Sequence, residues 1–157
     1  MSIITDHNPR ASIIFNNILI VCVGNVCRSV TAERILKSKL HSVNIYSAGI
    51  GALVGRGVEK KAAEILDTHG YNSKNHLAQQ LNSELVMQSD LVLVMEIEQR
   101  KFIIKKYPQA SGKVFLLGKW NDELEIADPY KKSTEVFVAI FNKIEESCNC
   151  WYERLNK

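Results

Sequence analysis

The sequence predicts an α/β domain in which helices cover both faces of a doubly wound, mostly parallel sheet of four strands, giving three layers. Four short apolar runs rich in Val, Ile and Leu alternate along the chain with longer segments of helical periodicity. This alternation is typical of β-α-β units with parallel strands. The runs at residues 18–23 and 91–95 are also continuous, without intervening polar residues, which indicates strands that are buried on both faces.

The first half of the chain contains two pairs of a strand and a helix. Residues 18–23 form a continuous β-branched run, and residues 29–40 carry an apolar stripe at helical spacing that consists of Ala32, Ile35, Leu36 and Leu40. Residues 43–47 predict a short second strand. A loop with four glycines, at residues 48–57, separates this strand from a helix over residues 58–69 that a glycine ends.

The second half of the chain repeats the pattern. A helical turn at residues 82–87 precedes a buried strand at residues 91–95, and a helix over residues 98–107 ends at a proline. A strand at residues 114–117 and a long loop lead to a final amphipathic helix over residues 134–154. On this helix we expect one face to carry Val138, Phe141, Ile144, Cys148 and Trp151.

We expect residues 17–157 to form a single domain, with a core of ordinary size. The polar, irregular residues 1–16 predict a mobile N-terminal extension without a signal-peptide pattern. No apolar run approaches the ~20 residues of a membrane-spanning helix. The formal charge of +3 is too small to predict nucleic-acid binding. The expectation is therefore a cytoplasmic protein, a monomer or weak oligomer, with no membrane insertion.

The four cysteines do not predict a structural disulfide framework or a metal site. Without a secretory signal, their even number carries little weight for disulfides. Cys148 and Cys150 lie two residues apart on a helix and point to different faces. No histidine stands at a spacing that would complete a zinc site with these two or with Cys22 and Cys27.

The segment from Cys22 to Ser29 is the strongest candidate for a functional site. It reads Cys-Val-Gly-Asn-Val-Cys-Arg-Ser and joins a strand to a helix at the edge of the sheet where doubly wound proteins bind ligands. Backbone N–H groups and the helix dipole can surround a tetrahedral oxyanion there, and an arginine adds planar donors. We expect phosphate to be bound by Val23, Gly24, Asn25, Val26, Cys27, Arg28 and Ser29.

Cys22 is placed to be a nucleophile in this loop. A helix N-terminus and the Arg28 guanidinium both favour a thiolate. Ser29 can donate a hydrogen bond to the sulfur, and Asn25 tolerates the left-handed backbone that a tight loop needs. Because an anion bound here lies against the sulfur, the natural reaction is displacement at phosphorus, which gives a phosphocysteine.

Asp128 is the best candidate for the acid that protonates the leaving oxygen. It lies in the loop after the last strand, at the same edge of the sheet as Cys22, and Pro129 favours an extended backbone before it. General acid catalysis of this kind contributes about 10²–10⁴-fold. The same carboxylate could then activate the water that hydrolyses the phosphoenzyme.

The Cys-x5-Arg-Ser loop, Gly24-Asn25 within it and the later Asp128-Pro129-Tyr130 together resemble the low molecular weight protein tyrosine phosphatases. The resemblance extends from about Asn17 to the C-terminus. Residues 47–55 and 93–96 are most similar to the bacterial branch that works with tyrosine autokinases of capsule and exopolysaccharide production.

The resemblance implies hydrolysis of phosphotyrosine in a protein, with an autokinase tail as partner and with no metal or organic cofactor. Cys22 would be the nucleophile, Arg28 would bind the phosphate, and Asp128 would act as acid and then as base. The pocket for the tyrosine ring would be walled by Leu53 and Tyr130.

The resemblance also implies that Cys27 forms a reversible disulfide with Cys22 under peroxide, which protects the nucleophile from overoxidation. Two residues depart from the family pattern, since Val30 and Ala127 stand where proline is usual. Proline at the first turn of a helix is preorganised, so these changes loosen two loops without removing a catalytic group.

Two other functions remain open. An arsenate reductase on the same fold passes oxidation to further cysteines in a mid-chain segment, but residues 28–147 contain no cysteine. A phosphoprotein-binding module without catalysis is the second alternative, and the joint presence of Cys22, Arg28 and Asp128 argues against it.

Overall fold

The computed structural model describes residues 15–156, which form four strands and five α-helices in alternation. Of the predicted N-terminal extension over residues 1–16, residues 1–14 lie outside the described part of the chain. The strands are β1 (Asn17–Cys22), β2 (Asn44–Gly49), β3 (Leu91–Val94) and β4 (Val114–Leu116). The helices are α1 (Arg28–Lys37), α2 (Lys60–Thr68), α3 (Ser83–Gln88), α4 (Ile97–Lys106) and α5 (Thr134–Leu155), with a 3₁₀ turn, η1 (Pro108–Ala110).

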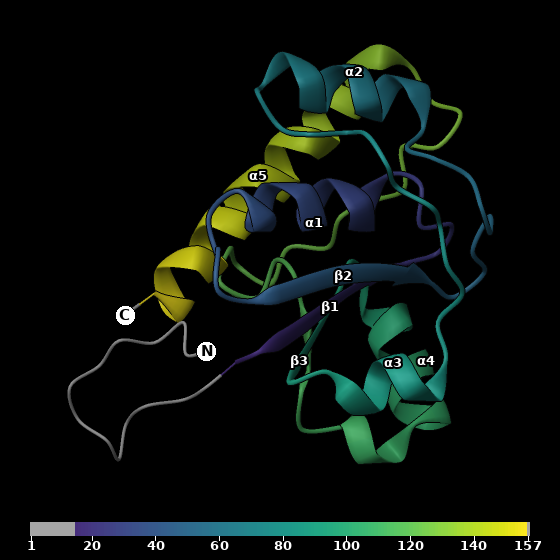
Figure 1. Ribbon diagram of the computed structural model, residues 1–157, viewed down its shortest axis with the longest axis vertical. Helices are drawn as coiled ribbons and strands as arrows, with labels where there is room; N and C mark the ends of the chain where they lie inside the picture. Colours follow the sequence, from purple (N-terminus) through teal and green to yellow (C-terminus); the bar gives the residue numbers. More distant parts are fainter. Residues whose placement is uncertain (1–14, 157) are drawn as a thin grey trace.

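The four strands form one sheet in the order β2-β1-β3-β4, and every pair is parallel. Helices α1, α2 and α5 cover one face, and α3 and α4 cover the other (Figure 1). The predicted three-layer, doubly wound fold is therefore confirmed. Within the described chain no helix is long and apolar enough to cross a membrane.

The strand β1 supplies side chains to two separate apolar clusters because successive residues point to opposite faces. Ile18 and Ile20 belong to the cluster under α1 and α5, whereas Leu19 and Val21 belong to the cluster under α3 and α4. All four of these side chains are fully buried. Burial on both faces explains why the strand reads as a continuous apolar run.

The carboxyl ends of the strands meet at one edge of the sheet. Val21 of β1 pairs with Ala48 of β2 and with Val94 of β3, and Val94 pairs with Leu116 of β4. The loops that follow these strands therefore open on the same side of the molecule. This register brings the segment after β1 close to the loops after β2, β3 and β4.

The predicted buried face of the last helix was wrong at Val138, which is 40% exposed. The buried side chains of α5 are Phe137, Ile140, Phe141, Ile144, Ser147, Cys148, Trp151 and Leu155. At about 100° per residue, Phe137 falls near the centre of this stripe and Val138 about 100° away from it. Three adjacent apolar residues at the start of the helix, at positions 136–138, made the choice ambiguous in the sequence.

Candidate active site

The loop between β1 and α1 brings a thiol and a guanidinium to one cavity. Cys22 is the last residue of β1, and Arg28 is the first residue of α1. Each is only 2% exposed overall. Both line a cavity of about 160 Å³ together with Asp128, Leu53 and Tyr130, so the structure places the predicted nucleophile, arginine, acid and ring-wall residues around one space.

The carbonyl groups of this loop all point away from the cavity. The carbonyls of Cys22, Val23 and Gly24 accept hydrogen bonds from the backbone N–H groups of residues 50, 51 and 53, at 2.9–3.0 Å. The Asn25 carbonyl bonds to His76 Nε2, at 2.7 Å. The carbonyls of Val26 and Cys27 accept from the backbone N–H groups of residues 59 and 31. Three separate segments of the chain therefore hold the loop in its shape.

The N–H groups of the same loop are left for a ligand. Those of Val23, Gly24, Val26 and Cys27 donate to no acceptor within residues 15–156. Asn25 has a φ of 59°, a left-handed conformation that turns the chain inside the loop. Successive N–H groups that converge at a helix N-terminus form an anion-binding concavity. The predicted phosphate-binding residues thus form a continuous cradle next to the Cys22 sulfur.

Gly49, at the end of β2, is required for this arrangement. A side chain there would collide with the carbonyl oxygen of Val23 and would crowd Ala52. Only a residue without a Cβ lets the segment after β2 run close enough to donate its N–H groups to the loop.

A chain of hydrogen bonds fixes the direction of the Ser29 hydroxyl toward the sulfur. Asn25 Nδ2 donates to Ser29 Oγ at 2.8 Å and to Ser47 Oγ at 2.9 Å. Ser47 in turn donates to Glu33 at 2.6 Å. Because the amide nitrogen of Asn25 can only donate, Ser29 keeps its own proton for Cys22 Sγ, 2.9 Å away. The Asn25 backbone N–H also donates to this sulfur, at 3.3 Å. Two donors therefore converge on the Cys22 sulfur.

Arg28 is held by one of its terminal nitrogens. Nη1 donates to Glu96 Oε1 at 2.6 Å and to the Ile126 carbonyl at 2.9 Å. The other edge, formed by Nε and Nη2, keeps two parallel donors for a bound anion. A guanidinium fixed in this way needs no reorganisation when phosphate enters.

Asp128 lies beside the free edge of this guanidinium. Its Oδ2 is 3.7 Å from Arg28 Nη2, and its Oδ1 accepts the backbone N–H of Tyr130 at 3.0 Å. The carboxylate side chain is 48% exposed, so water can reach it. Pro129 is buried, which ties this loop to the core although Ala127 before the acid is exposed. Exposure to solvent and proximity to the cradle suit a group that gives and takes protons.

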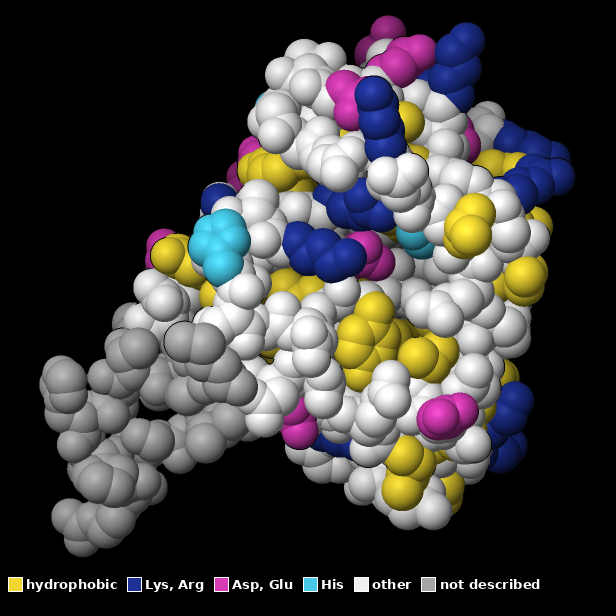
Figure 2. Space-filling model, in the orientation of Figure 1, with side chains coloured by type: hydrophobic (Ala, Val, Ile, Leu, Met, Phe, Trp, Pro, Cys, Tyr) yellow, Lys and Arg dark blue, Asp and Glu magenta, His cyan; other side chains and the backbone are white. Residues whose placement is uncertain are grey.

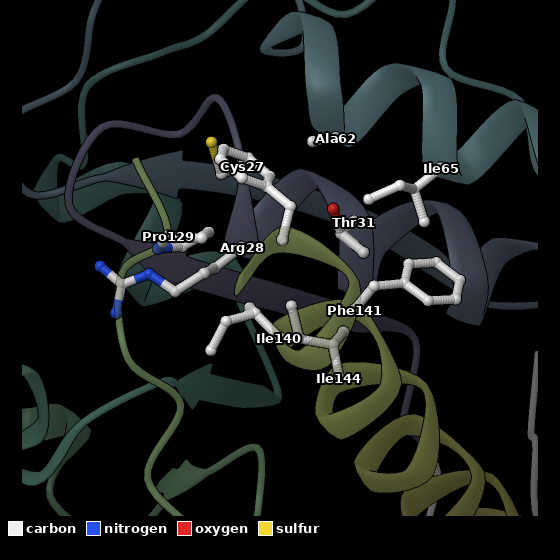
Figure 3. A pocket seen from close by; sticks show the side chains of 10 residues that line it. Cys27, Arg28, Thr31, Ala62, Ile65, Pro129, Ile140, Phe141 and Ile144 are labelled. Carbon is white, nitrogen blue, oxygen red and sulfur yellow. The ribbon is translucent and has the colours of Figure 1, made fainter. Parts of the chain in front are cut away.

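A second, smaller cavity lies behind the loop, between α1, α2 and α5. Cys27, Arg28 and Pro129 border it at one end, and apolar side chains of α2 and α5 line the rest (Figure 3). It measures about 10 Å³, which is room for about one water molecule. The loop and the Asp128 segment thus rest on tightly packed core.

Cys27 is a free thiol, as is Cys22. Burial raises the pKa of the Cys27 thiol well above its usual value, and the nearby Glu59 carboxylate adds to the shift. Cys27 therefore stays protonated at neutral pH. Its role as a redox partner of Cys22 stays a prediction.

Sequence reasoning missed several residues that support the site. Glu96, which holds Arg28, directly follows β3, so the rule that strand carboxyl ends share an edge could have found it. Ser47 lies on the predicted second strand. His76 comes from an irregular segment between α2 and α3, where the sequence carries no local signal. Among residues 15–156 there is no group of three or more His, Cys, Asp or Glu arranged to hold a metal ion.

Comparison with known proteins gives the family. The profile of the low molecular weight phosphotyrosine protein phosphatases matches residues 17–157. The chain is 45% identical to the low molecular weight protein-tyrosine-phosphatase Wzb of Salmonella typhimurium, over 90% of this chain and 95% of that protein. The crystal structure of the Erwinia amylovora tyrosine phosphatase AmsI is 39% identical, covers 94% of this chain and 97% of its own, and superposes with a TM-score of 0.90. The structure of Vibrio vulnificus Wzb in complex with benzylphosphonate is 40% identical, covers 90% of this chain and 99% of its own, and superposes with a TM-score of 0.87. The chain therefore belongs to the low molecular weight protein tyrosine phosphatase family, as its sequence predicts.

Proposed function

We propose that this tyrosine phosphatase hydrolyses phosphotyrosine through a phosphocysteine intermediate on Cys22. The proposal rests above all on the cradle, in which unpaired N–H groups and the free edge of Arg28 converge beside a sulfur that itself accepts two hydrogen bonds. A phosphate held there has its phosphorus in front of the nucleophile. The donors also match the equatorial oxygens, whose charge must be stabilised during transfer.

In the first step the Cys22 thiolate attacks phosphorus, and an S–P bond forms while the bond from phosphorus to the tyrosine oxygen breaks. Asp128 gives a proton to the departing phenolic oxygen. The Ser29 hydroxyl stabilises the sulfur before attack. In-line geometry requires the leaving oxygen to face the open side of the cavity, where Asp128 lies.

In the second step water replaces the phenol and attacks the phosphocysteine. The Asp128 carboxylate takes a proton from this water, the S–P bond breaks, and inorganic phosphate leaves with Cys22 again a thiolate. The half-exposed position of Asp128 allows the exchange of a phenol for water between the steps. Cys22, Arg28 and Asp128 supply the chemistry of both steps.

The depth of the cavity selects tyrosine. Leu53 and Tyr130 are both half-buried and line its mouth, one on each of two loops. A phosphorylated ring packed between them reaches Cys22, whereas phosphoserine and phosphothreonine are too short. Because the relatives include Wzb and AmsI, we propose that the enzyme acts in the cytoplasm, with the tyrosine-rich tail of an autokinase of capsule or exopolysaccharide production as its partner.

A leaving-group series with two variants tests this function. Cys22→Ser should abolish turnover of aryl phosphates but still bind inorganic phosphate. Asp128→Asn should lower kcat/KM by about 10²–10³-fold for phenyl phosphate and phosphotyrosine but much less for p-nitrophenyl phosphate, whose leaving group needs no acid. Because kcat/KM reports only the first step, a slow second step does not mask the difference. Mass spectrometry of acid-quenched Asp128→Asn enzyme should detect phosphocysteine.

Full activity in Cys22→Ser would rule out the phosphocysteine, and an equal loss for every leaving group would remove Asp128 from the role of acid. A panel of phosphotyrosine, phosphoserine and phosphothreonine peptides tests the pocket, and equal rates on all three would contradict it. Thioredoxin-dependent reduction of arsenate in place of hydrolysis would identify the alternative enzyme.

A further inference from the structure

A second groove opens next to the catalytic cavity. It measures about 350 Å³ and shares Val26, Leu53 and Tyr130 with the cavity that holds Cys22. Its remaining wall comes from the end of the loop after β2 and the first residue of α2. A peptide whose phosphotyrosine ring passes between Leu53 and Tyr130 would therefore lie with its neighbouring residues over this groove.

The charged side chains that this groove adds are two cations and one carboxylate. Arg56 and Lys60 line it, both are exposed, and neither forms an ion pair with any residue from 15 to 156. The carboxylate of Glu59 also lines the groove, but it accepts the backbone N–H of Lys61 at the start of α2 and so is engaged in capping the helix. The groove lining therefore carries two unpaired cations and one capping carboxylate, which leaves it a net positive charge.

The segment that follows Tyr130, a residue of the groove wall, is basic as well. Lys131 and Lys132 are exposed, Lys131 Nζ lies 5.7 Å from the centre of the Tyr130 ring, and Lys61 Nζ donates to the Lys132 carbonyl at 2.7 Å, which joins this segment to α2. Figure 2 shows Lys and Arg side chains gathered on this part of the surface, near the loops that precede α2 and α5. Positive charge is therefore present both in the groove lining and in the segment next to Tyr130.

Backbone hydrogen bonds give the groove a defined shape. Arg56 accepts from the backbone N–H of Ala78 at 2.8 Å, and its own N–H donates to the Leu53 carbonyl at 3.1 Å. The N–H of Glu59 donates to the Val26 carbonyl at 2.9 Å, which fixes the start of α2 against the phosphate loop. The backbone that carries Arg56 and leads into Lys60 is thus held in place relative to the phosphate loop.

We propose that this groove binds an anionic side chain, a carboxylate or a second phosphate, carried by a residue close in sequence to the phosphotyrosine. The inference rests on the proposed function, since it places the phosphotyrosine itself in the catalytic cavity. In an extended peptide, side chains two residues apart lie on one side at about 6.8 Å, a spacing that suits two adjoining pockets. The enzyme thereby selects phosphotyrosines within acidic or multiply phosphorylated segments.

The test compares kcat/KM for five phosphotyrosine peptides. One has neutral flanks, two have Glu placed N-terminal or C-terminal to the phosphotyrosine, and two carry a nonhydrolysable phosphonate analogue of phosphotyrosine at the same places. The wild-type enzyme should prefer the anionic peptides by about two- to fivefold for each cation engaged, the range of exposed ion pairs. The preference should shrink in about 0.5 M salt, where charges are screened within a few Å.

Two charge-matched variants locate the effect. Arg56→Glu/Lys60→Glu should bring the ratio of anionic to neutral peptide to one or below. Lys105→Glu/Lys106→Glu, which changes the net charge equally on α4 at the opposite face of the sheet, should keep the wild-type ratio. Circular dichroism of both variants confirms folding, and the ratio within each variant is independent of its amount of active enzyme.

Equal rates for neutral and anionic peptides, or a preference that survives Arg56→Glu/Lys60→Glu, would overturn the inference. A preference for both Glu and phosphonate neighbours supports recognition of charge, and a preference for the phosphonate alone assigns the groove to a second phosphate. Failure of the proposed function itself looks different, because the wild-type enzyme would then hydrolyse neither the neutral peptide nor p-nitrophenyl phosphate.

Discussion

Glu96 fixes how Arg28 lies in the wall of the cavity that holds Cys22. Its carboxylate accepts from Arg28 Nη1 at 2.6 Å, and it is 38% exposed while the guanidinium is 2% exposed. We expect Glu96→Gln to lower kcat/KM for p-nitrophenyl phosphate by about 10–100-fold, since a hydrogen bond to a charged group is worth about 1.5–3 kcal/mol. Inhibition by inorganic phosphate should weaken in parallel, because the same free edge of Arg28 binds it.

Glu98→Gln is the matched control for this prediction. Glu98 lies two residues further on, at the start of α4, and its carboxylate forms an exposed pair with Lys101 at 3.5 Å. This variant should keep wild-type kinetics. If Glu96→Gln retained both its kcat/KM and its phosphate inhibition constant, Glu96 would be only a cap of α4 and not a positioning residue for Arg28.

The sequence shows which groups can react but says little about what holds them. Cys22, Arg28 and Ser29 lie on one short segment, so strand and helix signals alone place them together. Asp128 is distant, yet the parallel sheet predicts its position because loops after successive strands share an edge. The bond from His76 to the Asn25 carbonyl depends on the path of an irregular segment, which no local pattern specifies.

At the scale of elements, apolar periodicity located every helix and strand, and the ends differ by a few residues. Helix α1 ends at Lys37, earlier than expected, because the Ser38 N–H bonds to the carbonyls of Arg34 and Ile35 and the chain then turns. The wrong placement of Val138 on the buried face of α5 has a similar cause. Apolar periodicity locates an element more reliably than it locates the ends of the element or its first buried residue.

Two serines of α5 should change stability in opposite directions. Ser147 is fully buried, and its hydroxyl has no hydrogen-bond partner among the described residues. Ser147→Ala should raise the free energy of unfolding by about 0.5–1 kcal/mol, because it removes an unpaired buried polar group and favours the helix. Ser133 caps the same helix, because its hydroxyl oxygen accepts the Val136 N–H. Ser133→Ala should therefore lower the free energy of unfolding by about 1 kcal/mol.

Urea unfolding of both variants measures these changes. A shift in the midpoint concentration of urea at an unchanged m-value reports the change in the free energy of unfolding. The catalytic rate of folded enzyme should be the same in both, because neither serine lines the cavity that holds Cys22. Loss of stability in Ser147→Ala would show that the hydroxyl has a partner or that its volume is needed for packing.

At the scale of the whole molecule, the site exists only where distant segments converge. The loop after β1 is held by N–H groups from the loop after β2, by His76 and by the start of α2, while Arg28 reaches Glu96 and Ile126. Right-handed crossovers and a parallel sheet dictate this convergence from the order of elements. The order and direction of the strands and helices could therefore be predicted from the sequence. The hydrogen bonds by which these distant segments hold the loop could be seen only in the structure.

Because the cradle is assembled from the whole fold, an anion bound in it should stabilise the whole molecule against heat. Phosphate at a concentration 100 times its dissociation constant adds about 2.7 kcal/mol, which corresponds to a rise in Tm of about 5–10 °C for a chain of this size. Arg28→Ala should lose most of this rise, and Cys22→Ser should keep it. Chloride at matched ionic strength is the control in a thermal scan. A rise of equal size with chloride, or one that survives Arg28→Ala, would mean that the stabilising phosphate binds elsewhere than beside Cys22.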